Sequence, residues 1–208
     1  MLRRPCLIVS TVLASFLFTS GCSKKDSLQS PADGTKKPVA QVLRLGNGAE
    51  PQDLDPQTVT GVPEHNIFQA LFEGLLSEDP KDLHPVPGLA DKWEISSDGL
   101  VYTFHLRENL KWSDGTPITA DQFVESYRRM LSPALAAEYS YLLWFAVGAE
   151  DFNKGKLTDF AQTGFKALDP RTLEVTLKSA TPYLLKIIAS HHSWCVVPVH
   201  VIKKFGKL

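Results

Sequence analysis

The sequence predicts a mixed α/β fold for the part of the chain that follows residue 40. Short runs of aromatic and β-branched residues flank turns, as in residues 93–106, and other segments repeat apolar residues at helical spacing, as in residues 63–75. The 208 residues are 43% hydrophobic and 22% charged, which is ordinary for a globular protein. This composition excludes a disordered tail and a collagen-like repeat.

The first 21 residues are predicted to be an export signal. Two arginines precede an uncharged apolar run over residues 6–18, which is shorter than the roughly 20 residues that span a bilayer. Small residues and Cys22 follow in a pattern that resembles a bacterial lipobox, although Thr19 stands where an aliphatic residue is usual. We therefore expect a lipid on Cys22. The alternatives are an uncleaved anchor, or cleavage nearby that leaves this cysteine free.

Residues 22–40 are predicted to be a flexible tether, because they are polar, small and proline-containing. Removal of the signal takes away two arginines and no acidic residue, so the exported chain has 20 basic and 23 acidic residues and a formal charge of −3. That charge gives no reason to expect nucleic acid as a partner. Three cysteines are too few for a disulfide scaffold.

The body of the chain is predicted to begin with a short strand and a helix. Residues 42–45 have the pattern of a strand, and a proline-rich loop follows it. Pro63 and Glu64 suit the first turn of a helix. The apolar face predicted for this helix consists of Ile67, Phe68, Leu71, Phe72 and Leu75.

A β-hairpin is predicted next. Its strands are residues 93–95 and 100–106, and Asp98-Gly99 lies in the turn because this pair tolerates positive φ. A second tight turn is predicted over residues 113–117, with structural roles for Trp112 and Asp114.

The remaining elements alternate between helix and strand. Residues 138–150 predict a buried aromatic helix in which Tyr141, Trp144 and Phe145 pack in the core, since residues three or four apart share a helix face. A helix capped by Thr119 or Asp121 is predicted to run to about Leu131, and two strands are predicted over residues 165–168 and 172–177. Two short helices are predicted, one over residues 182–189 and one that begins near Pro198.

Two groups of residues could carry chemistry. Asp53 and Asp55 could form an acid/base pair, but turn and cap chemistry around Pro56 is the favoured interpretation. His191, His192, Cys195 and His200 could be zinc ligands, but their spacing matches no standard finger, so a core role is favoured. The sequence contains no G-x-S-x-G, Walker, G-x-G-x-x-G or H-E-x-x-H motif, which fits a binding protein rather than an enzyme.

Several motifs resemble those of a known family. They are Leu54-Asp55-Pro56, Gly61-Val62-Pro63-Glu64 and Leu71-Phe72-Glu73-Gly74-Leu75, then the stretch YTFHLRENLKWSDGTPITADQFV and the strand Thr172–Leu177. Their order and spacing are similar to those of bacterial extracellular solute-binding proteins of the peptide/nickel class, the oligopeptide-binding proteins of ABC importers. The resemblance covers residues 41–208.

The resemblance implies a periplasmic-binding-protein-like α/β fold with two lobes around a ligand. It places residues 41–72 in the first lobe, residues 73–198 in a smaller inserted subdomain, and residues 199–208 at the start of the return to the first lobe. Family members are more than twice as long. The remaining part of the first lobe and the second lobe, which holds the peptide's amino group, are therefore expected to be absent from this truncated chain.

The resemblance also implies a function and a site. The chain is expected to be an exported lipoprotein, periplasmic or at the cell surface, that acts as a monomer without cofactor or catalysis. It would capture oligopeptides for the permease subunits of an ABC importer. Thr60, Gly61 and Val62 would lie at the ligand cleft, where Val62 would offer its backbone N–H and C=O to the peptide, and Tyr139 would supply an aromatic wall. The alternatives are a metal or metal-chelate receptor of the same fold, a secreted metallohydrolase, and a surface lipoprotein without transport activity.

Overall fold

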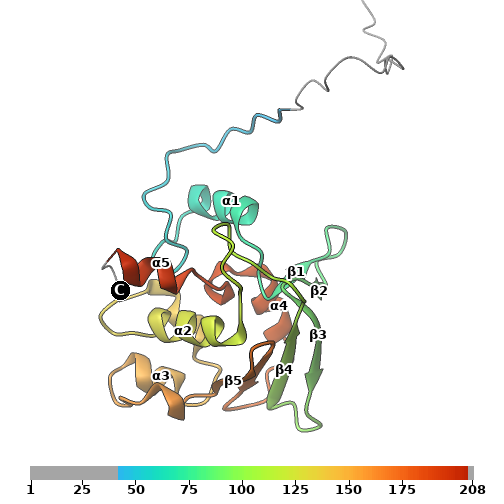
Figure 1. Ribbon diagram of the computed structural model, residues 1–208, viewed down its shortest axis with the longest axis vertical. Coiled ribbons are helices and arrows are strands. Elements are labelled where there is room, and N and C mark those ends of the chain that lie inside the picture. The colour runs from blue at the N-terminus through green and yellow to red at the C-terminus, as the bar shows by residue number, and fades with distance from the viewer. Residues whose placement is uncertain (1–41, 206–208) are drawn as a thin grey trace, which may run out of the picture. The chain divides into compact units, whose positions relative to one another are not determined.

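The computed structural model describes residues 42–205, which form short helices and antiparallel strands (Figure 1). The strands are β1 Leu76–Glu78, β2 Pro85–Pro87, β3 Ala90–Ile95, β4 Val101–Leu106, β5 Phe165–Asp169 and β6 Thr172–Thr176. The α-helices are α1 Val62–Leu71, α2 Ala120–Met130, α3 Ala149–Asn153, α4 Leu184–Ser190 and α5 Val199–Lys204. Three 3₁₀ helices are η1 Glu138–Leu143, η2 Phe160–Gln162 and η3 His192–Trp194. The mixed α/β class is confirmed for this part of the chain.

The main sheet has the strand order β3-β4-β6-β5, and every pairing in it is antiparallel. The predicted hairpin is confirmed as β3 and β4, with Gly99 at a φ of 70° in the turn between them. The two later strands are confirmed as β5 and β6. Each of these hairpins joins neighbours in sequence, which explains why local patterns were sufficient to predict them.

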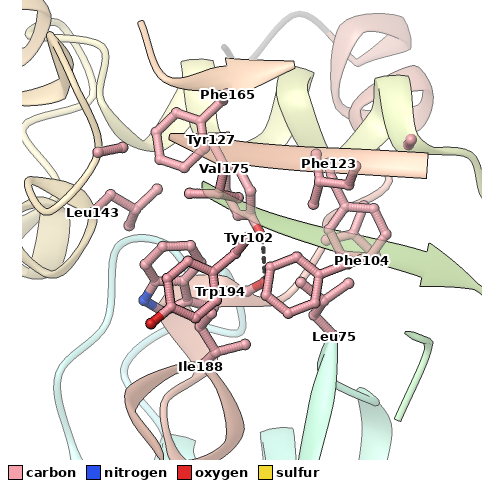
Figure 2. Close-up of a cluster of buried hydrophobic side chains, with 14 of the residues drawn as sticks. Leu75, Tyr102, Phe104, Phe123, Tyr127, Leu143, Phe165, Val175, Ile188 and Trp194 are labelled. Atoms are coloured by element: carbon pink, nitrogen blue, oxygen red, sulfur yellow. Dashed lines mark hydrogen bonds between the residues drawn. The ribbon is translucent and has the colours of Figure 1, made fainter. Parts of the chain in front are cut away.

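The hydrophobic core lies on one face of this sheet. Tyr102, Phe104 and Leu106 alternate along β4 as buried residues, and their partners Val175 and Leu173 on β6 are buried on the same face. Helix α2 lies against β5 and β6. Figure 2 shows how side chains from α2, α4 and η3 meet those of the sheet in this core.

Trp194 of η3 is the largest fully buried side chain of the core. Its ring packs against Tyr127 of α2 at a centroid distance of 5.5 Å and against Phe165 of β5 at 6.1 Å. The Tyr127 hydroxyl donates a hydrogen bond of 3.1 Å to the Trp194 carbonyl oxygen, drawn in Figure 2. Segments far apart in the sequence are therefore joined at the centre of the core.

The beginning of the body differs from the prediction. Residues 42–45 form no strand, because a strand requires a hydrogen-bonded partner and none of the described strands pairs with them. Helix α1 ends at Leu71, which is 67% exposed, and Leu75 is buried beyond the helix. The small sheet of β1 and β2 was not predicted, since prolines in β2 argue against a strand.

The aromatic segment 138–150 is also not the single buried helix that was predicted. It divides into η1 and the start of α3, with Gly148 between them at a φ of 66°. Tyr141 is 49% exposed, so its predicted core role is wrong, whereas Trp144 and Phe145 pack against the core as half-buried residues. The 3₁₀ helix η1 ends at Leu143, and Gly148 then occupies the N-cap position of α3 with a left-handed backbone that a continuous helix cannot contain.

The remaining helices agree with the prediction. Helix α2 follows Thr119, which occupies the N-cap position without a side-chain capping bond. The turn over residues 113–117 is confirmed: the amide of Thr116 donates to Asp114 at 2.9 Å, and Gly115 has a φ of 88°. No helix within residues 42–205 has both the length and the apolar character needed to cross a bilayer.

Candidate peptide-binding site

The start of α1 and the loop before it form the first part of the candidate site. Gly61 precedes the helix with an extended backbone, φ −84° and ψ 155°. Thr60 is exposed, and the Val62 side chain is 72% exposed. Amide groups in the first turn of a helix have no acceptor within that helix. Pro63 has no N–H, so the first turn leaves the N–H of Val62 without an acceptor in the helix.

Glu64 supports this backbone from inside. Its side chain is buried, and its Oε1 accepts a hydrogen bond of 2.6 Å from the Gln52 amide. A Cβ atom at Gly61 would collide with the Glu64 carboxylate, so a larger residue at this position would displace that side chain. The carboxylate near the helix start also complements the positive end of the helix dipole.

Tyr139 reaches this backbone from η1. Its hydroxyl donates a hydrogen bond of 3.4 Å to the carbonyl oxygen of Thr60, which is 79 residues away in the sequence. The structure thus brings Thr60, Gly61, Val62 and Tyr139 together. The remaining predicted site residue, Cys22, lies outside the described residues.

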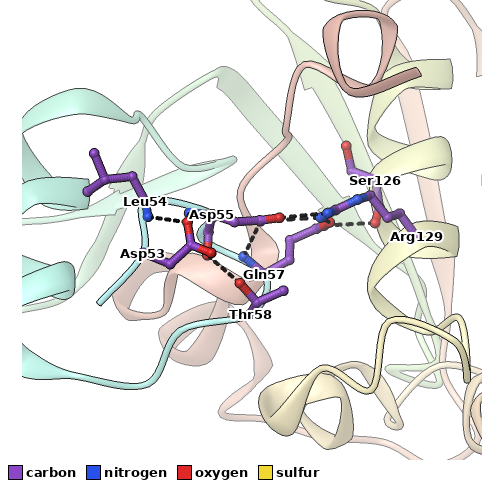
Figure 3. A network of polar contacts seen from close by, with 7 residues as sticks. All are labelled: Asp53, Leu54, Asp55, Gln57, Thr58, Ser126 and Arg129. Atoms are coloured by element: carbon purple, nitrogen blue, oxygen red, sulfur yellow. Dashed lines mark hydrogen bonds and ion pairs between the residues drawn. The ribbon is translucent and has the colours of Figure 1, made fainter. Parts of the chain in front are cut away.

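An ion pair fixes the loop that leads to the site (Figure 3). Asp55 accepts two hydrogen bonds from Arg129 of α2, Nη2 to Oδ2 at 2.6 Å and Nη1 to Oδ1 at 3.2 Å. Nη1 of Arg129 also donates to Gln57 Oε1 at 2.6 Å, and Gln57 Nε2 donates to the Ser126 carbonyl at 2.8 Å. The bidentate geometry holds the loop in one register on α2.

The turn interpretation of the two aspartates is confirmed. Asp53 Oδ1 accepts from the amides of Leu54 at 2.6 Å and Asp55 at 3.3 Å, and Asp55 Oδ1 accepts from the Gln57 amide at 3.0 Å. The sequence did not indicate the pairing of Asp55 with Arg129, because no local pattern joins residues 74 positions apart.

Two histidines pack beneath Tyr139. The rings of His191 and His192 are stacked with centroids 4.4 Å apart, and the Tyr139 ring meets His191 edge-on at 4.7 Å. Burial is the main cause that lowers the pKa of His191 to about 4, and the charges of His192 and His65 lower it further. Burial also lowers the pKa of His192, and the nearby Val59 carbonyl acts in the opposite direction by raising it.

These histidines do not form a metal site with Cys195 and His200. The four side chains do not bring three ligand atoms within 4.8 Å of one another; within residues 42–205 only Asp79, Asp82 and His84 do so, on an exposed loop. His200 instead bonds to Asp114 at 2.9 Å. Burial raises the pKa of the Cys195 thiol to about 12, so this residue is a neutral core side chain.

Comparisons with known proteins agree on one family. The family described as bacterial extracellular solute-binding proteins, family 5 Middle, matches residues 84–206. The periplasmic oligopeptide-binding protein OppA of Salmonella typhimurium is 42% identical over 209 residues, which cover 99% of this chain and 37% of that protein. OppA of Escherichia coli is 46% identical over 171 residues, covering 80% and 30%.

A solved structure shows the same relationship. Haemophilus influenzae OppA in complex with the peptide RPPGFSPFR matches with a TM-score of 0.72 at 40% identity, over 77% of this chain and 32% of that one. The chain therefore spans about a third of the length of these relatives. Its fold matches part of an oligopeptide-binding protein of the periplasmic type. The chain belongs to family 5 of the bacterial extracellular solute-binding proteins, a family of binding proteins rather than enzymes.

Proposed function

We propose that this chain supplies part of the peptide-binding surface of an ABC importer's substrate-binding protein. The observation that carries the proposal is the hydrogen bond from the Tyr139 hydroxyl to the carbonyl of Thr60, which directly precedes Gly61 and the exposed Val62. The relatives are named for oligopeptide binding, and the Haemophilus relative was solved with a nine-residue peptide. Both support peptide as the ligand class.

In this mechanism an extended peptide lies beside the site loop and pairs with its backbone. Gly61 already has the extended conformation that such pairing requires. Val62 begins α1, so its carbonyl is directed into the helix ladder and its N–H is the group left for a ligand. Backbone recognition does not read side chains, which suits a receptor for peptides of many sequences.

Tyr139 adds a wall and positions the Thr60 carbonyl. A tyrosine ring offers a large apolar face for a peptide side chain, while its hydroxyl stays bonded to the loop. Thr60 carries no charge, so we propose no salt bridge to the ligand at this position. Charged groups that hold the peptide termini would lie elsewhere in the binding protein.

We also propose how the bound peptide reaches the importer. The protein would be exported, anchored through a lipid on Cys22 and the tether 22–40, and would pass peptide to permease subunits as a monomer. Residues 41–72 and 199–208 would belong to the first lobe and residues 73–198 to its inserted subdomain. The length of the family members named above supports a second lobe that encloses the ligand.

The test is peptide binding by the intact protein, purified from its own host and titrated with RPPGFSPFR in a calorimeter. We expect binding without hydrolysis. Tyr139→Ala is expected to weaken it about tenfold through loss of the aromatic contact. Tyr183→Ala is the matched control, because Tyr183 is 55% exposed and its ring packs against Phe145, away from Tyr139. No binding, or an equal effect of both substitutions, would contradict the proposal.

A further inference from the structure

We propose that His191 and His192 make peptide capture dependent on pH, because they hold Tyr139 against the site loop only while both imidazoles are neutral. The inference rests on the proposed function and adds its regulation. The two histidines act as positioning residues, since they reach the site through Tyr139.

The contacts form a continuous path from the histidine pair to the site. The His191 and His192 rings are stacked at 4.4 Å with 26° between their planes. Tyr139 meets them edge-on, at 4.7 Å from His191 and 5.9 Å from His192. Its hydroxyl then bonds to the Thr60 carbonyl at 3.4 Å. A shift of the pair is therefore transmitted to the loop that would face the peptide.

The arrangement of His191 requires its neutral form. Its Nδ1 accepts hydrogen bonds from the Ser193 amide at 3.2 Å and the Ser193 hydroxyl at 2.7 Å. This nitrogen thereby caps the start of η3. A proton on Nδ1 would point at the amide hydrogen and end that bond, because both groups would then be donors.

Burial also disfavours a charge on His192. It is 7% exposed and packs against Phe68 and His65 of α1, and neither ring nitrogen makes a well-aligned hydrogen bond within the described residues. Two imidazolium rings stacked at this distance would also repel each other in surroundings of low polarity.

Within residues 42–205 no carboxylate is bonded to either imidazole, and only the Val59 carbonyl opposes the lowered pKa of His192. On α1, Glu64 is bonded to the Gln52 amide, and Glu73 after the helix is paired with Arg107 at 2.6 Å. Glu138 at the start of η1 is exposed. The other titratable groups on these elements are neutral or basic: His65, Tyr139, Tyr141, Lys186 and Cys195.

The direction of the pH effect follows from these surroundings. The pKa of His191 falls from 6.5 to about 4 when it is packed, and that of His192 also falls. Between about pH 6.5 and 4, an exposed imidazole therefore binds a proton more readily than a packed one. Protonation in this range shifts the equilibrium away from the packed arrangement and towards one in which the rings are exposed. If the packed arrangement binds peptide, affinity is full above pH 6.5 and is lost as the pH falls below it.

The experiment measures the Kd of RPPGFSPFR for the intact protein at pH 7.0 and pH 5.0; the side chains of this peptide do not titrate in that range. At pH 5.0, about 1.5 units below the ordinary pKa of histidine, the titration of one histidine can raise the Kd by at most roughly thirtyfold. We expect a Kd about tenfold higher at pH 5.0 than at pH 7.0. By linkage, binding at pH 5.5 releases protons, which calorimetry in two buffers of different ionisation enthalpy detects without any substitution.

The variant His191→Asn with His192→Phe keeps an acceptor for the Ser193 amide and an aromatic ring against Phe68, but removes both titrations. Whatever its Kd at pH 7.0, the variant should show the same Kd at pH 5.0 and no proton release at pH 5.5. Absence of binding to the unchanged protein at pH 7.0 would refute the proposed function itself. Binding at pH 7.0 with the same Kd at pH 5.0, no proton release, or an equal loss in the variant would overturn this inference alone.

Discussion

Asp55→Asn, which breaks the ion pair with Arg129, is predicted to lower the free energy of unfolding by about 3 kcal/mol. The side chain of Arg129 is 7% exposed and that of Asp55 24%, so the substitution leaves a buried guanidinium without its counter-charge. Breaking a fully buried pair costs about 3–5 kcal/mol, and the partial exposure of Asp55 favours the lower end. Asparagine keeps the size and one oxygen, so the change isolates the charge.

The assay is urea unfolding of the intact protein, followed by fluorescence. A loss of this size lowers the urea concentration at the unfolding midpoint while the slope m stays unchanged. Arg128→Gln is the control, because Arg128 is the neighbouring residue on α2 and its ion pair with Glu125 is exposed. It should cost less than about 0.5 kcal/mol.

Equal stability losses in the two variants would refute the reasoning. They would mean that Arg129 finds water or another partner when Asp55 loses its charge. If the reasoning holds, Asp55→Asn should also weaken peptide binding, because the loop from Asp55 to Thr60 keeps only the bonds of Gln57 as its attachment to α2. Arg128→Gln should leave binding unchanged.

Three further substitutions test the core and one surface contact. Tyr127→Phe should cost about 1 kcal/mol in urea unfolding, since it leaves the buried Trp194 carbonyl without its donor. Gly164→Ala should cost about 1–3 kcal/mol or more, because the added Cβ would collide with a carbonyl of β6. Hydrogen bonding to His200 lowers the pKa of Asp114 from 3.8 to about 2, so the stabilisation is complete above pH 3.8 and is lost as the pH falls towards 2. His200→Ala should return that pKa towards 3.8 in an NMR titration of the carboxyl group.

Local signals explain which elements the sequence predicted well. The hairpin of β3 and β4 needs only alternating strand residues and a glycine that adopts positive φ, and all of these lie within residues 90–106. The end of α1 depends on a different kind of information. Leu75 fits the helical spacing, but it is buried beyond the helix, where the chain turns into β1. Tertiary packing overrode the periodic pattern at this point.

The candidate site shows the same limit more clearly. The resemblance to solute-binding proteins suggested Thr60, Gly61, Val62 and Tyr139, whereas no spacing in the sequence joins Tyr139 to a loop 79 residues earlier. The supporting residues Arg129 and Glu64 were not identified either. A charged residue on an amphipathic helix is expected to face solvent, and only the fold shows that Arg129 is buried against Asp55.

The packing of Trp194 explains how a core that is distant in sequence can define a binding surface. Trp194 is fixed between α2 and β5, and it is the last residue of the 3₁₀ helix that begins at His192. The position of the histidine pair is therefore set by the core, and through Tyr139 the pair sets the position of the Thr60 carbonyl. A substitution that loosens Trp194 should thus weaken peptide binding as well as stability, although Trp194 lies inside the core and does not face the ligand.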